Sequence, residues 1–337
     1  RALESMRSGG YSFKDALCEL IDNSIWHGLA KNTDIDISFY EKTSEKSRLR
    51  EVFVSDTGRG MSVDELSEAV QIGKSSTFGS SDNFGRFGYG LIAGALTQCK
   101  IVEIYSKQKN GNWNYVKYDF SKVAAGQDIP DPKEKTPANN YLKNITDSGT
   151  IVVWSLFDLA ESFNDEWQTY NVAGSRKGDL GYLHYELGRM YRKSIGEKIV
   201  GTKKGKTAIV KNDNISKMTL NGKKIIPWDP LYFAKTPGFE DDPDPHEIYD
   251  ELVVPLDTHP LDKLRTGKEE DNIIIRMTLL NEKWRSHNQK GQNPKREELY
   301  QRHIHQNEGV SVLRNGREVF YGHIPRVGPN EERRFRY

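Results

Sequence analysis

The sequence has few cysteines, no long apolar segment and almost no net charge, and each absence excludes a class of protein. Cys18 and Cys99 are the two cysteines of the 337 residues and lie in apolar patterns of helical period. We therefore expect buried free thiols rather than a disulfide-stabilised secreted domain. No apolar stretch approaches the ~18 residues that a membrane-spanning helix needs. The 49 basic and 48 acidic residues leave a net charge of +1, which gives the whole chain no general attraction for nucleic acid or membrane.

The chain is long enough for two domains. Aromatic residues make up 10% and argue against disorder, although the mean hydropathy of −0.73 is polar. We predict a first domain at 1–170 and a second at 171–337. The chain opens on Arg1 rather than Met, which suggests a trimmed start. It stops at "EERRFRY", which resembles the start of a strand, so we expect the second domain to be truncated at its C-terminal end. The composition favours a cytoplasmic protein, or a nuclear one in a eukaryote.

The hydrophobic periodicity predicts an α+β fold in both halves, because strands and helices do not alternate strictly. Helices are predicted within 13–28, 62–73, 83–98 and 180–195, and strands within 34–40, 51–56, 101–106, 113–120, 150–156, 251–256, 272–280 and 309–321. A hairpin is predicted at 217–227, with Asn221-Gly222 as its type I′ turn. Ser62 and Glu65 form a predicted capping box at the start of the second helix. Residues 124–140 and 164–178 are predicted to be loop and linker.

The first chemical motif is "ELIDN", in which Glu19 and Asn23 are four residues apart. The apolar residues around them recur at helical spacing and predict one buried face. Glu19 and Asn23 then lie about one turn apart on another face of the helix. Two solvated polar side chains would fit this position, but a carboxylate and a carboxamide could also hold a water and a Mg²⁺ ion.

The second motif, "VSDTGRGM", follows an apolar strand. Asp56 ends the strand, where a buried carboxylate can accept a hydrogen bond from an exocyclic amine. Gly58 and Gly60 are expected to turn the chain with positive φ and to let it approach a ligand closely. Taken alone, this pattern is also typical of an ordinary turn.

Two glycine-rich stretches come next. In "IGKSSTFGSSDNFG", Lys74 or Ser75 could reach phosphate oxygens if this loop closes as a lid, although an inert surface turn is equally compatible. In "NFGRFGYGL", the glycines lead into a helix start whose N–H groups could hold phosphates. The residues that we assign to this phosphate site are Gly85, Gly88, Tyr89, Gly90 and Leu91. Finally, Thr150 begins a strand, where its hydroxyl could support Asp56.

The order of these motifs resembles the GHKL ATPase superfamily of DNA gyrase, the ninety-kilodalton heat-shock chaperone, histidine kinases and MutL. Within it, the chain is most similar to the Microrchidia (MORC)-type ATPases and their bacterial relatives. The stretches that carry this resemblance are "RSGGYSFKDALCELIDNS", "GRFGYGL", "GTIVVWSL" and "LGYLHYELGRMYRKSI". The resemblance implies a Bergerat-type ATP-binding α/β sandwich followed by a smaller α+β transducer domain of the S5-like type. It is clearest for residues 1–160.

The resemblance also implies roles for individual residues. Asn23 would ligate the Mg²⁺ that bridges the ATP phosphates, and Glu19 would be the general base that activates water. Asp56 would bind the adenine amine, with Gly58, Gly60 and Met61 packed against the base. Thr150 would help to fix Asp56 and a bridging water. The implied activity is Mg²⁺-dependent ATP hydrolysis, with ATP-gated homodimerisation that drives a clamp or compaction activity on DNA or a partner.

One feature departs from the family pattern, and one residue that the family requires is not yet assigned. Trp26 and His27 stand where many relatives carry an acidic residue, so the contacts to ribose or adenine are not defined there. A cation from the second domain usually reaches the γ-phosphate, and Lys290 is our candidate, with Arg314 and Arg317 as others. The histidines show no metal-ligand spacing.

Other functions fit the sequence less well than this one. A histidine kinase is disfavoured because its motif begins with Asn rather than Glu and needs a phosphoacceptor helix upstream. An ATP-dependent chaperone fits "GRFGYG" but not the second half. A non-hydrolysing ATP switch remains an alternative, although such a module has no need of Glu19. The basic runs at 192–206 and 293–298 could touch DNA phosphate, but their mixed charge favours a solvated surface.

Overall fold

The computed structural model describes most of the first half of the chain and separate segments of the second. The described residues are 4, 7, 12–26, 33–42, 45–71, 90–142, 145–158, 181–195, 197–203, 206–211, 215–232, 245–255, 272–280, 309–314 and 316–322. They separate into two compact units. Unit 1 is Arg1–Gly188, Lys193–Lys198 and Val210–Ile225, and unit 2 is Arg189–Arg192, Ile199–Ile209 and Ile226–Tyr337.

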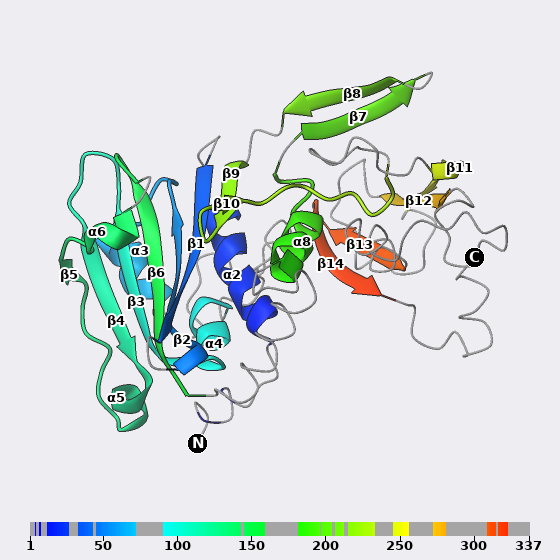
Figure 1. The fold of residues 1–337 in the computed structure, drawn as a ribbon. Helices are drawn as coiled ribbons and strands as arrows, with labels where there is room; N and C mark the ends of the chain where they lie inside the picture. The colour runs from blue at the N-terminus through cyan, green and yellow to red at the C-terminus, as the bar shows by residue number, and fades with distance from the viewer. Residues whose placement is uncertain are drawn as a thin grey trace. The chain divides into compact units, whose positions relative to one another are not determined.

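Unit 1 is built on an eight-stranded mixed sheet with the order β10-β9-β1-β2-β6-β3-β4-β5 (Figure 1). Its strands are β1 (Thr33–Lys42), β2 (Glu45–Asp56), β3 (Cys99–Lys107), β4 (Asn114–Asp119), β5 (Lys133–Glu134), β6 (Gly149–Phe157), β9 (Ile215–Leu220) and β10 (Lys223–Lys224). Neighbouring strands are antiparallel except β1 and β9, which are parallel. The fold is therefore α+β, as predicted.

The described helices of unit 1 lie in the four segments predicted to be helical and in two short segments that were not predicted. They are α2 (Phe13–Trp26), α3 (Val63–Ala69), α4 (Gly90–Leu96), α5 (Phe120–Ala124) and α6 (Asn139–Leu142), and α8 (Gly181–Met190) begins there too. The predicted capping box at α3 is present: Ser62 Oγ accepts from the Glu65 amide at 3.2 Å, and Glu65 Oε2 accepts from the Ser62 amide at 2.8 Å.

The apolar face of α2 packs on one face of the sheet. The apolar residues that recur at helical spacing in α2 are buried: Phe13, Ala16, Leu17, Leu20 and Ile21. The Phe13 ring lies edge-on to Phe39 of β1 and Trp154 of β6, with centroids 5.7 and 6.4 Å apart. Helix α4 contacts α2 on the same side of the sheet (Figure 1). A Cβ on Gly94 of α4 would lie 3.5 Å from the Ala16 Cα, so these small residues allow the two helices to approach closely.

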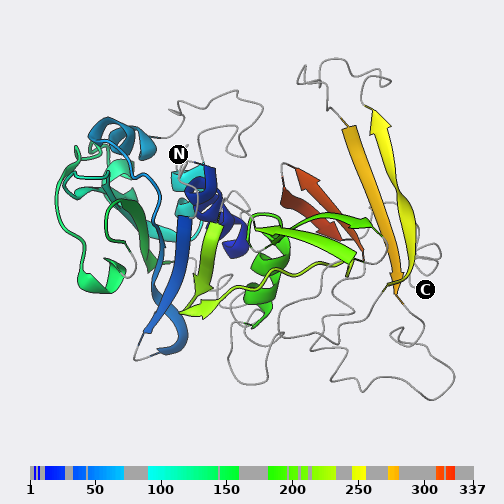
Figure 2. The ribbon, with the colours of Figure 1, turned by 90° about the horizontal axis from the view of Figure 1, so that it is seen from above.

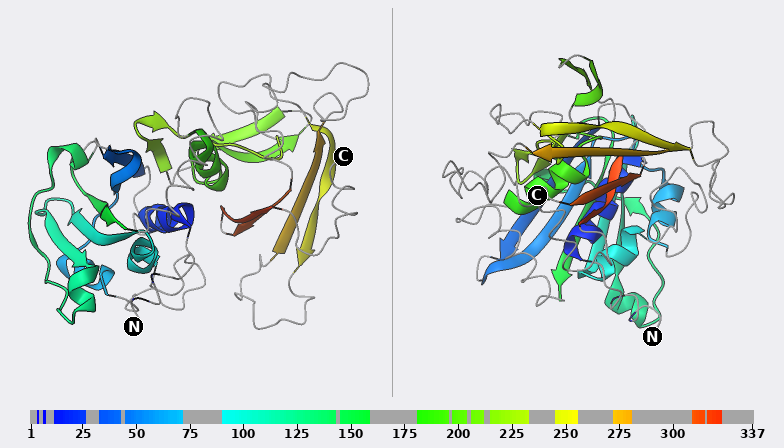
Figure 3. Two further views of the ribbon diagram at one scale, coloured as in Figure 1. Left: turned by 60° about the horizontal axis from the view of Figure 1, so that its bottom comes forward. Right: turned by 90° about the vertical axis from the view of Figure 1, so that its right-hand side faces the viewer.

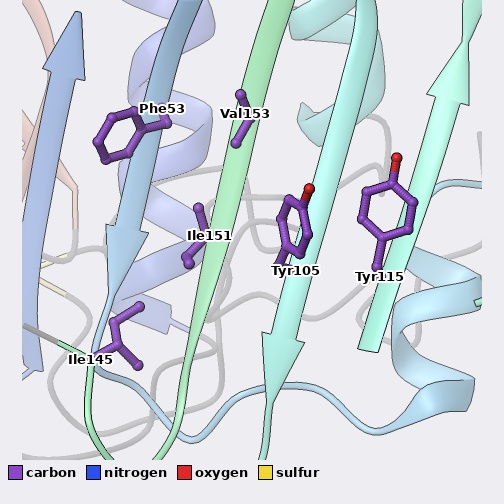
Figure 4. Packing of buried hydrophobic residues seen from close by; sticks show 6 residues of the cluster. All are labelled: Phe53, Tyr105, Tyr115, Ile145, Ile151 and Val153. Atoms are coloured by element: carbon purple, nitrogen blue, oxygen red, sulfur yellow. The ribbon is translucent and has the colours of Figure 1, made fainter. Parts of the chain in front are cut away.

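The other face of the sheet carries a second core. Its buried members, Phe53, Tyr105, Tyr115, Ile145, Ile151 and Val153, stand on the side of the strands turned away from α2 (Figure 4). Tyr141 of α6 packs edge-on against Phe53 at 5.1 Å, and the Lys135 ammonium lies 3.9 Å from the centre of the Tyr115 ring. Because both faces are covered, the central strands are almost continuously buried, as in "VFV" and "IVVW".

The hairpin predicted around Asn221-Gly222 forms β9 and β10. Both turn residues have positive φ, 48° and 79°, as a type I′ turn requires. The hairpin joins the sheet of unit 1, because β9 pairs with β1 (Figure 2), and the Asn221 amide donates to the Ile37 carbonyl at 2.8 Å. The predicted boundary at 170 is not tested by this observation and stays a prediction.

Three predictions made from the sequence need correction. Residues 124–140 were predicted to be loop, but they include β5 and the start of α6. The basic run at 192–206 was predicted to be a solvated surface, but Arg192 and Ser194 are buried. The run also includes β7 (Glu197–Lys203), which forms a two-stranded sheet with β8 (Lys206–Lys211). Cys99 begins β3 rather than lying in a helix. It is nevertheless a buried free thiol, as is Cys18.

Unit 2 contains β11 (Pro245–Pro255) paired with β12 (Asn272–Leu280), and β13 (Val310–Arg314) paired with β14 (Arg317–Gly322). They are separate two-stranded ribbons (Figure 3). Within unit 2, the buried Glu318 carboxylate accepts from Arg189 Nε at 2.8 Å and from Arg192 Nη1 at 2.9 Å. Ser311 Oγ also donates to it at 2.6 Å. Among the described helices, none is long and apolar enough to cross a membrane.

Candidate functional site

Sheet register brings the predicted site residues of β2 and β6 together. Asp56 of β2 pairs with Thr150 of β6, and Thr150 pairs in turn with Ser106 of β3. Directly paired residues project from the same face of a sheet. Thr150 lies four residues before Trp154, which contacts α2, so this polar row projects from the face that α2 covers. The row lies at the C-terminal ends of β2 and β3 and the start of β6.

Asp56 is the centre of this row and is 7% exposed. Its Oδ1 accepts from the Gly58 amide at 2.9 Å, and its Oδ2 accepts from Ser24 Oγ at 3.0 Å. The backbone of Thr150 also donates to it. Burial raises the pKa of Asp56 to about 6, and the three hydrogen bonds oppose this rise. The carboxylate is thus buried at a strand end, as the sequence predicted, and is ionised at neutral pH.

The loop after Asp56 is held against the sheet at several points. Gly60 has φ 71°, and a Cβ on it would lie 2.0 Å from the Lys107 carbonyl oxygen. Only glycine fits this approach. Gly58 was also expected to have positive φ, but it is not among the described residues that do. It contributes its amide to Asp56 instead, and its carbonyl accepts from Ser148 Oγ at 2.7 Å.

The Thr150 hydroxyl was predicted to support Asp56, but the hydroxyl and the backbone of this residue have different partners. Its backbone supports Asp56, whereas its hydroxyl lies 2.9 Å from Ser106 Oγ. Ser106 is fully buried, and its hydroxyl oxygen accepts from the Met61 amide at 2.7 Å. Met61, predicted to contact a base, is therefore anchored through its backbone, while its side chain is half-buried.

Helix α2 carries Glu19 and Asn23 as predicted, four residues apart and both half-buried. Glu19 lies on the side of α2 that faces α4, because a Cβ on Gly94 would be 3.8 Å from its Cγ. Asn23 immediately precedes Ser24, whose hydroxyl is bonded to Asp56. Glu19 and Asn23 are therefore on the same helix as Ser24, a direct partner of Asp56. Asn23 is next to Ser24, and Glu19 lies about one helical turn before Asn23.

Several predicted residues lie outside the described part of the chain. They are Lys74, Ser75, Gly85, Gly88, Tyr89 and Lys290, together with His27. Gly90 is the first residue of α4 and Leu91 is half-buried in its first turn. Arg314 and Arg317 flank the turn between β13 and β14 in unit 2, and the Arg317 guanidinium lies 5.8 Å from the centre of the Tyr191 ring.

The sequence interpretation missed three serines. Ser24 and Ser148 adjoin predicted motifs, in "DNS" and "SGT", and that proximity was an available signal. Ser106 gave none, since a serine at the end of an alternating strand is an ordinary solvent-facing residue. Among the described residues, no group of three histidine, cysteine or acidic side chains could hold a metal ion. A cation here would depend on ligands such as the Asn23 carboxamide and on the oxygens of a bound ligand.

Residues 11–150, which are less than half of the chain, match the family model of histidine kinase-, DNA gyrase B-, and HSP90-like ATPases. This segment therefore has the sequence pattern of a GHKL-type ATPase domain, and it contains Glu19, Asn23, Asp56 and Thr150. No curated protein matches the chain.

Among solved structures, the chain is similar to the ATPase region of Saccharomyces cerevisiae topoisomerase II, with 16% identity and a TM-score of 0.39. It is also similar to the ATPase and transducer domains of DNA topoisomerase II from Balamuthia mandrillaris, with 16% identity and a TM-score of 0.38. Each similarity covers 63% of this chain and 48% of the other, so the chain spans about half the length of these structures.

Proposed function

We propose that this chain binds Mg²⁺-ATP in unit 1 and hydrolyses it. The observation that carries the proposal is the Asp56 carboxylate, which is buried and accepts from the donors of Ser24, Gly58 and Thr150. An ionised carboxylate has about four acceptor positions and no donor. With three positions occupied, the remaining one suits a ligand N–H group. An adenine amine meets this requirement, whereas a carbonyl oxygen at the same position would be repelled.

The surroundings of Asp56 fit a flat, closely packed ligand. Gly60 brings its own backbone to the Lys107 carbonyl, and Gly149 similarly approaches Asp56, because a Cβ on it would lie 2.1 Å from the Asp56 carbonyl oxygen. The loop and both strand ends are thus fixed before any ligand arrives. A site that needs little rearrangement binds with a smaller entropic cost.

Asn23 and Glu19 would supply the chemistry next to this site. The Asn23 carboxamide oxygen is a hard ligand of the kind that Mg²⁺ accepts, alongside phosphate oxygens and waters. The Glu19 carboxylate would act as the general base that orients and deprotonates the attacking water. Bound Mg²⁺ would neutralise phosphate charge. Gly90 and Leu91, with the glycines before them, would contact the phosphates, and Lys74 or Ser75 would close over them.

The finer part of the proposal concerns what hydrolysis drives. We propose a MORC-type module in which ATP binding closes an N-terminal homodimer that acts as a clamp or compacting device on DNA or a partner. Its support is the likeness of the motifs around 6–24, 85–91 and 149–156 to that family. Light scattering with a non-hydrolysable ATP analogue tests the dimer. DNA binding should be measured as a function of salt concentration, since phosphate contacts weaken steeply with salt.

The activity is tested by Mg²⁺-ATP binding and steady-state turnover in four proteins. Wild type should bind and hydrolyse ATP, Glu19→Ala should bind without turnover, and Asp56→Asn should lose binding. Glu68→Gln, which alters an exposed acid on α3, is the control and should match wild type. Binding without turnover in wild type would instead indicate a non-hydrolysing switch, and failure of wild type to bind ATP would refute the proposed function.

A further inference from the structure

Ser106 joins three segments of the site through one buried hydroxyl. It is the penultimate residue of β3, directly before Lys107, and its side chain is fully buried. Its Oγ lies 2.7 Å from the Met61 amide nitrogen, 2.9 Å from Thr150 Oγ1 and 3.3 Å from the Gly149 carbonyl oxygen. These contacts connect the loop after β2, the start of β6 and β3.

The three contacts can form at the same time. A serine hydroxyl has one donor and two acceptor positions. If the Met61 amide and the Thr150 hydroxyl donate to Ser106, the Ser106 proton is free to bond the Gly149 carbonyl. The hydroxyl is then fully satisfied. Alanine would leave the partly buried Met61 amide without this acceptor, which is costly.

The contacts also connect Ser106 to Asp56 through a single residue, Thr150. Thr150 donates to Asp56 through its backbone and contacts Ser106 through its hydroxyl. Met61 follows Gly60, the residue with positive φ that is pressed against β3. The other end of the loop is held separately, by Ser148 at the Gly58 carbonyl. Ser106 therefore determines where the Met61 end of the loop lies relative to the carboxylate.

We propose that Ser106 is a positioning residue for the nucleotide base: it holds Met61 and Thr150 so that a base in contact with the loop presents its exocyclic amine to Asp56. The inference rests on the proposed ATP binding and deepens it. Ser106 touches neither phosphate nor water in this scheme. Its loss should weaken recognition of the base and leave the chemical step unchanged.

The experiment compares Ser106→Ala with Ser38→Ala. Ser38 is an equally suitable buried serine of the same sheet, but it lies on the opposite face and donates to Asp36 Oδ2 at 3.0 Å. Calorimetry gives the dissociation constants for Mg²⁺-ATP and for purine riboside triphosphate, which lacks the 6-amino group. Turnover gives KM and kcat, and thermal unfolding gives the stability of each variant.

We expect Ser106→Ala to weaken ATP binding by about tenfold, the effect of one hydrogen bond of about 1.4 kcal/mol. KM should rise by a similar factor, with kcat within about twofold of wild type. The analogue should lose less affinity, so the preference for ATP over the analogue should shrink. Ser38→Ala should lower the unfolding temperature without changing that preference. If Ser106→Ala is insoluble, Ser106→Cys, which keeps a weaker acceptor, should show the same effects to a smaller extent.

The outcomes separate this inference from the proposed function. If wild type binds ATP and the Ser106 variants keep its preference for ATP over the analogue, then Ser106 is merely structural, and ATP binding stands without it. A fall in the kcat of Ser106→Ala with unchanged KM would also overturn the positioning role. If wild type binds neither nucleotide, the proposed function itself fails.

Discussion

The buried carboxylate of Asp56 makes a quantitative prediction about stability. Its pKa is raised from 3.8 to about 6, and burial is the largest cause. One pKa unit corresponds to about 1.4 kcal/mol, so keeping this carboxylate ionised lowers the free energy of unfolding by about 3 kcal/mol above pH 6. Below about pH 4 the carboxyl is protonated in both the folded and the unfolded chain, and the penalty vanishes. This contribution to stability therefore decreases as pH rises from about 4 to about 6.

Asp56→Asn is the appropriate perturbation, because it removes the charge and keeps the shape. Its side-chain oxygen can still accept from the Gly58 amide. Its NH₂ group would face Ser24, whose hydroxyl is also placed to donate to the Leu20 carbonyl at 3.1 Å and can then accept. We expect the variant to fold and to lack the titration of residue 56.

The assay is urea unfolding of wild type and Asp56→Asn at several pH values between about 4 and 7.5. The free energy of unfolding of the variant, relative to wild type, should increase by about 3 kcal/mol across this range. Taking the difference between the two proteins cancels the other titrating groups. A difference that stays constant with pH would show that the carboxyl titrates normally and would refute the reasoning. If Asp56→Asn instead became less stable relative to wild type as the pH rises, the reasoning would be refuted more strongly.

The same titration should govern ligand binding. Since the ionised carboxylate is the acceptor, the affinity of wild type for ATP should fall as pH drops below about 6, whereas Asp56→Asn should bind weakly at every pH. Calorimetry at matched ionic strength measures both. Strong, pH-independent binding by wild type would show that Asp56 does not contact the base.

Four further substitutions test local contacts of the fold. Gly60→Ala should lower the free energy of unfolding by more than about 2 kcal/mol, because the new Cβ would meet the Lys107 carbonyl. Gly126 also has positive φ, but a Cβ there would have nothing within 4 Å, so Gly126→Ala should cost about 1 kcal/mol. Equal costs in urea unfolding would contradict the close approach at Gly60. Ser62→Ala should lower stability by about 1 kcal/mol through loss of the capping box, measured in the same way. Glu318→Gln should cost about 3–5 kcal/mol, because two buried arginines lose their shared counter-charge, and an unchanged unfolding profile would argue against that network.

Local features of this fold could be predicted because their causes are local. The buried face of α2 follows from apolar residues at helical spacing, and the turn at Asn221 and Gly222 follows from the ease with which these residues adopt positive φ. The capping box needs only Ser62 and Glu65, three residues apart. In each case the residues that determine the structure are neighbours in the sequence.

Long-range features could not be predicted in this way. Nothing in "ISKMTL" shows that β9 lies parallel to β1, because its alternating pattern would suit any strand with one buried face. Nor does β5 have a signal of its own, since its two residues are exposed and charged. The order of the strands depends on which apolar faces fit together, and the local pattern does not contain that information.

Ser106 shows how the two kinds of information combine at the site. Asp56 and Thr150 were found because they belong to motifs, yet the motifs do not say how residues 94 positions apart come to share a hydrogen bond. The register of β2, β6 and β3 supplies the answer, by aligning Asp56, Thr150 and Ser106 across three adjacent strands. Once the register is fixed, a hydroxyl on the third strand is within reach of the loop that leaves the first. A residue with no motif can therefore be required by the same geometry that gives the motif residues their roles.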